Sequence, residues 1–109
     1  MDKNIERIIC AANHYDDGEE HVHMPRNIKT GFVICGRRHH NCISIFALMV
    51  GFPYDEKGIA LMNTEEQGFL TSKDRFVNRT EALEIARKAN QILDEKEVRG
   101  DKLYSEDLY

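Results

Sequence analysis

Apolar and polar residues divide the chain into short segments with different periods. An apolar run within Ile5–Tyr15 predicts a buried strand, and Asp16-Asp17-Gly18 predicts a turn directly after it. The alternation at His21–His23 predicts a returning edge strand, so these two segments are expected to form a β-hairpin. Another strand is expected at Phe32–Cys35, where four apolar residues lie between two glycines.

Two later segments have the period of an amphipathic helix. In Cys42–Val50 the face that is expected to be buried, against the sheet or a partner subunit, consists of Cys42, Ile45, Phe46 and Met49. Arg79–Asp94 has a longer apolar stripe with charged residues on the opposite side. Between these helices, residues 54–66 form a polar connection that contains a short apolar piece, Ile59–Met62, and its structure is left open.

The stretch Gln67–Ala82 combines the most local signals. Apolar residues at 68–70 and 76–77 predict two short strands joined by a polar turn. Asn78 then predicts a helix start, with Glu81 three residues later completing a capping box. The whole chain, residues 1–109, is therefore expected to be one α+β domain with a small antiparallel sheet and two packed α-helices.

Composition narrows the classes of function. The 109 residues carry a net charge of −4, which argues against binding duplex nucleic acid through a broad basic face. A small anionic ligand remains compatible with this charge, because a few arginines in one pocket are sufficient. No apolar run reaches the roughly 20 residues of a membrane-spanning helix. Three cysteines without a CxxC motif favour a reducing cytoplasm.

The first candidate site is Gly36–His40, which lies between a predicted strand and a predicted helix. A helix start attracts anions, and arginines there add bidentate donors for a phosphate. Cations at a helix start are unfavourable unless an anion compensates, which favours a ligand. The alternative is a salt-bridged surface turn.

The second candidate site is the polar edge of Gln67–Ala82, whose donors could hold a phosphate. The alternative is a well-capped junction of hairpin and helix with a solvated rim. Phe76, Tyr104 and Tyr109 could stack on a base, although such aromatic residues more often belong to the core. The candidate ligand-binding residues from all these considerations are Arg26, Arg37, Arg38, His39, His40, Thr71, Ser72, Arg75, Phe76, Asn78 and Arg79.

Metal binding and catalysis receive less support. The five histidines do not follow a zinc-ligand spacing, so no metal and no cofactor are expected. No GxSxG, HExxH, P-loop or GxGxxG motif is present. His39 or His40 beside two arginines could cleave a phosphodiester by general acid–base chemistry, but no matching nucleophile is evident. We therefore expect a binding protein and keep an enzyme as an alternative.

Three sequence stretches together resemble a known family. GRRHHNC (36–42), QGFLTSKDRFVNRTEA (67–82) and the terminal LYSEDLY (103–109) resemble small phage and prophage proteins, the type 1 Thoeris anti-defence proteins. The resemblance covers most of the chain. Those proteins sequester the cyclic ADP-ribose signals made by bacterial TIR-domain enzymes, and can also hold cyclic oligonucleotide signals.

The resemblance carries several expectations about function. It implies binding of a cyclic ADP-ribose isomer or another cyclic nucleotide without cleavage, in the cytoplasm of the bacterial host. It also implies a homo-oligomer built from dimers, up to a hexamer, with no membrane and no duplex nucleic acid as partners. The alternatives are a phosphodiesterase that degrades such a signal, and a non-catalytic protein-interaction module.

Overall fold

A four-stranded antiparallel sheet carries the helices, which confirms the expected α+β class. The computed structural model describes residues 4–109, and its strands lie in the order β2-β1-β3-β4. The elements are β1 (Ile8–Tyr15), β2 (Phe32–Gly36), α1 (His39–Val50), α2 (Glu56–Met62), β3 (Glu66–Thr71), β4 (Phe76–Asn78), α3 (Arg79–Lys88), and the 3₁₀ turns η1 (Glu95–Glu97) and η2 (Ser105–Asp107).

The apolar strand β1 lies in the interior of the sheet, between β2 and β3. Ala11 of β1 lies opposite Gly36 of β2 and Phe69 of β3, and Phe69 in turn lies opposite Val77 of β4. A bulge between Ile8 and Cys10 shifts the register near the start of β1. Ala11 and Ala12, neighbours on opposite faces of β1, are both fully buried, whereas Ile9 is 53% exposed, so the apolar run is buried on both faces only in part.

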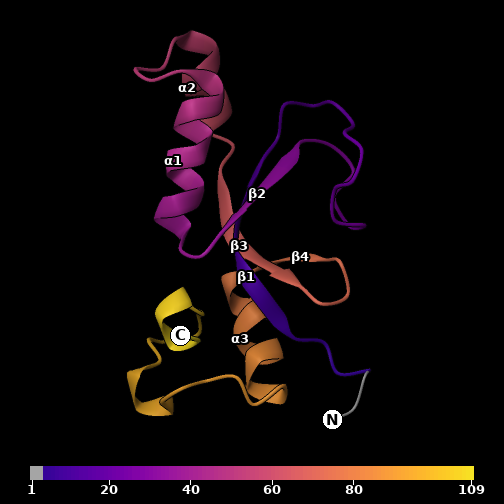
Figure 1. Cartoon of the computed structure of the whole chain (residues 1–109), viewed down its shortest axis with the longest axis vertical. Helices are drawn as coiled ribbons and strands as arrows, with labels where there is room; N and C mark the ends of the chain where they lie inside the picture. Colours follow the sequence, from indigo (N-terminus) through magenta and orange to yellow (C-terminus); the bar gives the residue numbers. More distant parts are fainter. Residues whose placement is uncertain (1–3) are drawn as a thin grey trace.

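Two apolar clusters lie on one face of this sheet. In the first, α3 packs Leu83 and Ala86 against Phe69 of β3. In the second, α1 packs Phe46 against Tyr15 of β1, and the two rings stack with centroids 4.0 Å apart. Figure 1 shows α1 and α3 at opposite ends of the molecule, with the C-terminal segment beside α3 and below the start of α1. The C-terminal segment therefore docks against α3, with Leu103 in the cluster around that helix.

The prediction of a first β-hairpin with a strand at His21–His23 is wrong. This segment contains no strand, and His23 has a left-handed φ of 62°, which an extended strand does not allow. Residues 16–31 instead form a long loop that reaches the outer edge of β4. There the Asn27 side chain donates to the carbonyl of Phe76 and accepts from its N–H, at 2.7 and 2.8 Å.

Other predicted boundaries also change. Helix α1 begins at His39 and buries His39, Cys42 and Phe46, whereas Ile45 and Met49 of the predicted buried face are exposed. Helix α3 ends at Lys88, six residues before the predicted end. The open segment before β3 contains α2.

The strands, turn and capping box predicted within Gln67–Ala82 are confirmed. Asn78 accepts from the N–H of Glu81, and the Glu81 carboxylate accepts from the N–H of Asn78. The end of the chain is docked on the rest of the fold, because Leu103 is fully buried in the cluster around α3.

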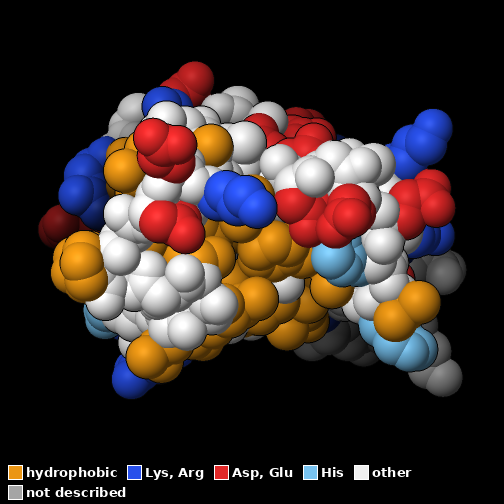
Figure 2. Space-filling model, turned by 90° about the horizontal axis from the view of Figure 1, so that it is seen from above, with side chains coloured by type: hydrophobic (Ala, Val, Ile, Leu, Met, Phe, Trp, Pro, Cys, Tyr) orange, Lys and Arg blue, Asp and Glu red, His pale blue; other side chains and the backbone are white. Residues whose placement is uncertain are grey.

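The end of the molecule formed by α1 and α2 leaves large apolar side chains in contact with solvent. Leu48 is 85% exposed and Phe52 is 75% exposed, and a shallow hollow beside them is lined by Ser44, Ala47 and Gly51. Figure 2 views the molecule from this end and shows hydrophobic side chains gathered across the middle of the face. Among the described residues, no helix has the length and apolarity to cross a bilayer.

Candidate functional site

The C-terminal segment brings together arginines that lie far apart in the sequence. Arg38, directly before α1, donates from Nη1 to the Ser105 hydroxyl at 3.1 Å and from Nη2 to the Tyr109 carbonyl at 2.7 Å. Arg79, the first residue of α3, donates to the Leu103 carbonyl at 2.8 Å. The docked end of the chain thereby connects the starts of both helices.

Each tyrosine of this segment lies beside two guanidinium groups. The Tyr104 ring has the guanidinium carbons of Arg79 and Arg99 at 4.6 and 4.1 Å from its centroid. The Tyr109 ring has those of Arg38 and Arg37 at 5.0 and 5.9 Å. These distances lie within the range of cation–π attraction. We call these residues the arginine–tyrosine cluster: Arg37, Arg38, Arg79, Arg99, Tyr104 and Tyr109.

The cluster has a local excess of positive charge. Within residues 4–109, Glu106 is the one acidic side chain in ion-pair contact with its four arginines, at 3.8 Å from Arg38 and 3.6 Å from Arg99. Partial burial also lowers the pKa of Arg79, because removing the charged guanidinium from water costs free energy. An anion would be attracted here although the whole chain carries a net charge of −4.

The two predicted histidines of this region lie in different environments. His39 is buried, its Nε2 donates to the Gly68 carbonyl at 2.7 Å, and its ring contacts Phe69 edge-on. Burial lowers the pKa of His39, which favours the neutral ring. His39 therefore connects α1 to β3, whereas His40 is exposed at the start of α1.

The second predicted cluster forms a separate ion-pair network at the start of the chain. Arg75 donates from Nε and Nη2 to the two carboxylate oxygens of Glu6, at 2.9 and 2.7 Å. The Thr71 hydroxyl donates to the same carboxylate at 2.5 Å. The hydrogen bonds from Arg75, followed by that from Thr71, lower the pKa of Glu6 to about 2 against partial burial. Nearby, the Ser72 hydroxyl accepts from the N–H of Arg7 at 2.9 Å.

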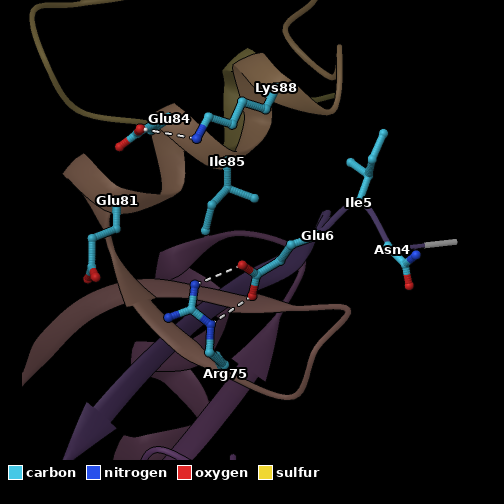
Figure 3. Close-up of a pocket in the computed structure, with 8 residues that line it drawn as sticks. All are labelled: Asn4, Ile5, Glu6, Arg75, Glu81, Glu84, Ile85 and Lys88. Carbon is cyan, nitrogen blue, oxygen red and sulfur yellow. Dashed lines mark hydrogen bonds and ion pairs between the residues drawn. The ribbon is translucent and has the colours of Figure 1, made fainter. Parts of the chain in front are cut away.

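A pocket of about 550 Å³ lies beside this ion pair, between the first described residues and α3. Figure 3 shows Glu6 and Arg75 facing each other at one side, and Glu84 paired with Lys88 on the helix above. Its lining residues are Asn4, Ile5, Glu6, Arg75, Glu81, Glu84, Ile85 and Lys88. The lining contains three carboxylates and two cations, and each cation is already paired with a carboxylate. This balance of charge disfavours an anionic ligand in the pocket.

The remaining predicted ligand residues are not part of either cluster. Phe76 is buried beside the His14 ring, so it belongs to the core, and Asn78 caps α3. Arg26 is exposed on the long loop, and its backbone N–H donates to the Asp74 carbonyl. Arg37, Arg38 and Arg79 thus lie together, whereas Thr71, Ser72 and Arg75 lie together at another place.

Three exposed residues of the long loop bring potential metal ligands together. Asp17, Glu19 and His21 each place one ligand atom within 4.8 Å of the others. His21 and Asp17 already pair at 2.8 Å. Their side chains satisfy one another in solvent, so we assign no metal to this group.

Sequence reasoning did not select Arg99, Ser105 or Glu106. Tyr104 and Tyr109 were considered only as rings that could stack on a base. The terminal stretch LYSEDLY could have indicated Ser105 and Glu106, because it contributes to the family resemblance, but its pattern alone does not predict a site. Only the docked position of this stretch places Arg99 against Tyr104 and Glu106 near Arg38.

A family model described as Phage T4 y16D protein matches residues 7–109. The chain belongs to the phage T4 y16D protein family. The match spans all four strands, the three helices and the docked C-terminal segment, so the arginine–tyrosine cluster lies within the y16D-family region. No curated protein and no solved structure matches the chain.

Proposed function

We propose that this y16D-family protein binds a cyclic ADP-ribose-type signalling nucleotide and sequesters it without cleavage. In this role it would block Thoeris-type signalling in the cytoplasm of the bacterial host, and cyclic oligonucleotide signals of the CBASS type are further candidate ligands. The observation that carries the proposal is the arginine–tyrosine cluster. Membership in a phage protein family is consistent with a role against host defence.

The cluster has the chemistry that such a ligand needs. A cyclic ADP-ribose carries two phosphates and an adenine, which require cationic hydrogen-bond donors and an aromatic or planar partner. Four guanidinium groups and two tyrosine rings meet here. Arg37 is exposed, and within residues 4–109 it makes no salt bridge, so its donors are accessible to a ligand.

Sequestration without turnover fits the surroundings of the histidines. A phosphodiesterase would need a group to activate the nucleophile close to the bound phosphate. The Nε2 of His39 donates to the buried Gly68 carbonyl, so this nitrogen is not available to activate a nucleophile. The alternative of an enzyme would therefore depend on the exposed His40.

The exposed apolar end of α1 and α2 supports a second proposal, that the protein is a homo-oligomer. Helix α1 contains no acidic or basic residue other than His39 and His40, although the chain carries a net charge of −4. Two copies could meet through this face without like-charge repulsion and bury Leu48 and Phe52 of both. Association would thereby remove a hydrophobic patch from water.

The decisive experiment separates binding from cleavage. Purified protein is incubated with a cyclic ADP-ribose isomer, free ligand is removed, and the protein is heat-denatured so that any bound molecule is released and analysed. Recovery of intact ligand is expected. Recovery of a linear product would establish the phosphodiesterase alternative, and ligand remaining wholly in the free fraction would contradict the proposal for that ligand.

A matched pair of arginine variants tests the location of the site. Arg37→Ala should weaken binding by about tenfold or more, because it removes charge-assisted hydrogen bonds. Arg87→Ala is the control, since Arg87 is also exposed but pairs with Glu95 outside the cluster. Equal affinities of the two variants would show that the ligand binds elsewhere.

A further inference from the structure

Glu106 occupies a distinctive position in the arginine–tyrosine cluster. Its Oε1 lies 3.8 Å from Arg38 Nη1, and its Oε2 lies 3.6 Å from Arg99 Nη2. Charge-assisted hydrogen bonds between guanidinium and carboxylate are about 2.7–2.9 Å long. Both contacts of Glu106 are longer than this, so neither is a hydrogen bond. The Glu106 side chain is also 62% exposed. A loosely held carboxylate therefore lies between two arginines.

Each of the two arginines also has contacts other than the one with Glu106, although the Ser105 hydroxyl that accepts from Arg38 itself donates to Glu106 Oε1 at 3.5 Å. Arg38 is fixed by the Ser105 hydroxyl and the Tyr109 carbonyl. The Arg99 guanidinium lies over the Tyr104 ring, 4.1 Å from its centroid. Displacement of the Glu106 carboxylate would leave both guanidinium groups directed toward the same space. Such preorganisation lowers the entropic cost of binding an anion there.

A hollow of about 460 Å³ adjoins this position, so an incoming ligand has room. Its lining residues are Lys96, Glu97, Val98, Arg99, Glu106 and Asp107. The Asp107 carboxylate is engaged, because it accepts from the N–H of Tyr104 at 2.9 Å. Lys96 adds a third cation to the lining, and Glu97 remains as an exposed acidic neighbour.

We propose that the carboxylate of Glu106 occupies the position of a ligand phosphate, and that Arg38 and Arg99 form the phosphate subsite. This inference rests on the proposed function and specifies one part of its site. A phosphate or pyrophosphate has more oxygens and more charge than a carboxylate, so it can accept short hydrogen bonds from both guanidinium groups. Glu106 then acts as an internal competitor, which disfavours weakly charged anions and yields to a pyrophosphate-containing ligand.

The test replaces Glu106 by an uncharged residue of the same shape. Calorimetric titrations of the full chain would compare wild type, Glu106→Gln and the control Glu95→Gln, with inorganic pyrophosphate and a cyclic ADP-ribose isomer as probes. Glu95 is an exposed carboxylate paired with an arginine outside the cluster, so the control changes net charge equally. Glu106→Gln should bind both probes about two- to fivefold more tightly, whereas Glu95→Gln should bind as wild type does.

Arg99→Ala completes the design, and it should weaken pyrophosphate binding by about tenfold or more. Binding by Glu106→Gln that is equal to or weaker than wild type would overturn the phosphate subsite while leaving the proposed function intact. Tighter pyrophosphate binding without any affinity for the cyclic ADP-ribose isomer would support the subsite and refute that ligand. If no variant binds either probe, both proposals are wrong.

Discussion

Replacing Glu6 by Gln tests how the start of the chain is fixed to the turn between β3 and β4. Glu6 accepts two hydrogen bonds from Arg75 and one from Thr71. Gln keeps the size of the side chain and one acceptor oxygen, but removes the charge. The variant therefore isolates the electrostatic part of the interaction.

The magnitude follows from the pKa of Glu6, which is lowered from 4.5 to about 2 mainly by Arg75. This difference corresponds to about 3 kcal/mol of folding free energy. Because the Arg75 side chain is 34% exposed, solvent screening reduces the expected loss to about 1–2 kcal/mol at pH 7. Glu95→Gln, at an exposed pair with Arg87, should cost at most a few tenths of a kcal/mol.

The assay is urea denaturation between pH 7 and pH 3. A carboxylate with a lowered pKa in the folded state stabilises the protein fully above its unfolded pKa, here 4.5, and loses this effect as the pH falls toward about 2. The free energies of unfolding of wild type and Glu6→Gln should thus differ most at neutral pH and converge below pH 4.5. A difference that stays constant from pH 7 to pH 3 would refute the electrostatic argument.

Two further changes probe the sheet and the exposed apolar face. Gly68→Ala should destabilise the fold by about 1–3 kcal/mol in the same assay, because its Cβ would lie 2.1 Å from the Val77 carbonyl oxygen. Gly18→Ala is a control with no neighbouring atom within 4 Å, although its positive φ adds local strain, and equal costs would contradict the steric explanation. Leu48→Glu should shift an oligomer toward monomer in light scattering after size-exclusion chromatography, whereas the exposed control Leu93→Glu should not. A wild-type chain that is already monomeric would refute the oligomer.

The sequence predicted elements well where local signals were dense. The two short strands, the turn and the capping box within Gln67–Ala82 depend on neighbours a few residues apart, and each of them is present. The prediction of a hairpin with a strand at His21–His23 was wrong, because an alternating pattern of only three residues does not distinguish a strand from a loop. The next strand along the chain that pairs with β1 is β2, which lies beyond the long loop.

The helix boundaries show a similar limit. The periodicity of Arg79–Asp94 continues past Lys88, but Asn90 adopts a left-handed conformation and the chain turns there. In α1 the apolar residues surround the helix, so the pattern could not determine which face would pack on the sheet. In the structure the face with Phe46 packs on the sheet, where its ring stacks on Tyr15, and Ile45 is partly exposed to solvent.

The candidate site was predicted only in part. Arg37 and Arg38 were selected because cations at a helix start are unfavourable without an anion, a signal that lies within a few residues of sequence. Arg75 was predicted as one of the phosphate donors on the polar edge of Gln67–Ala82, yet the fold pairs it with Glu6. Whether an arginine is free for a ligand or neutralised by a carboxylate depends on partners from distant parts of the chain.

By itself the sequence determined the α+β class and the strands and helix start within Gln67–Ala82. These features follow from apolar periodicity and capping, which act over one or two turns of chain. Only the tertiary structure decided that Arg38, Arg99 and Glu106 meet beside Tyr104 and Tyr109. Their convergence depends on the path of the chain after α3, because side chains more than 60 residues apart meet only when packing of Leu103 fixes that path.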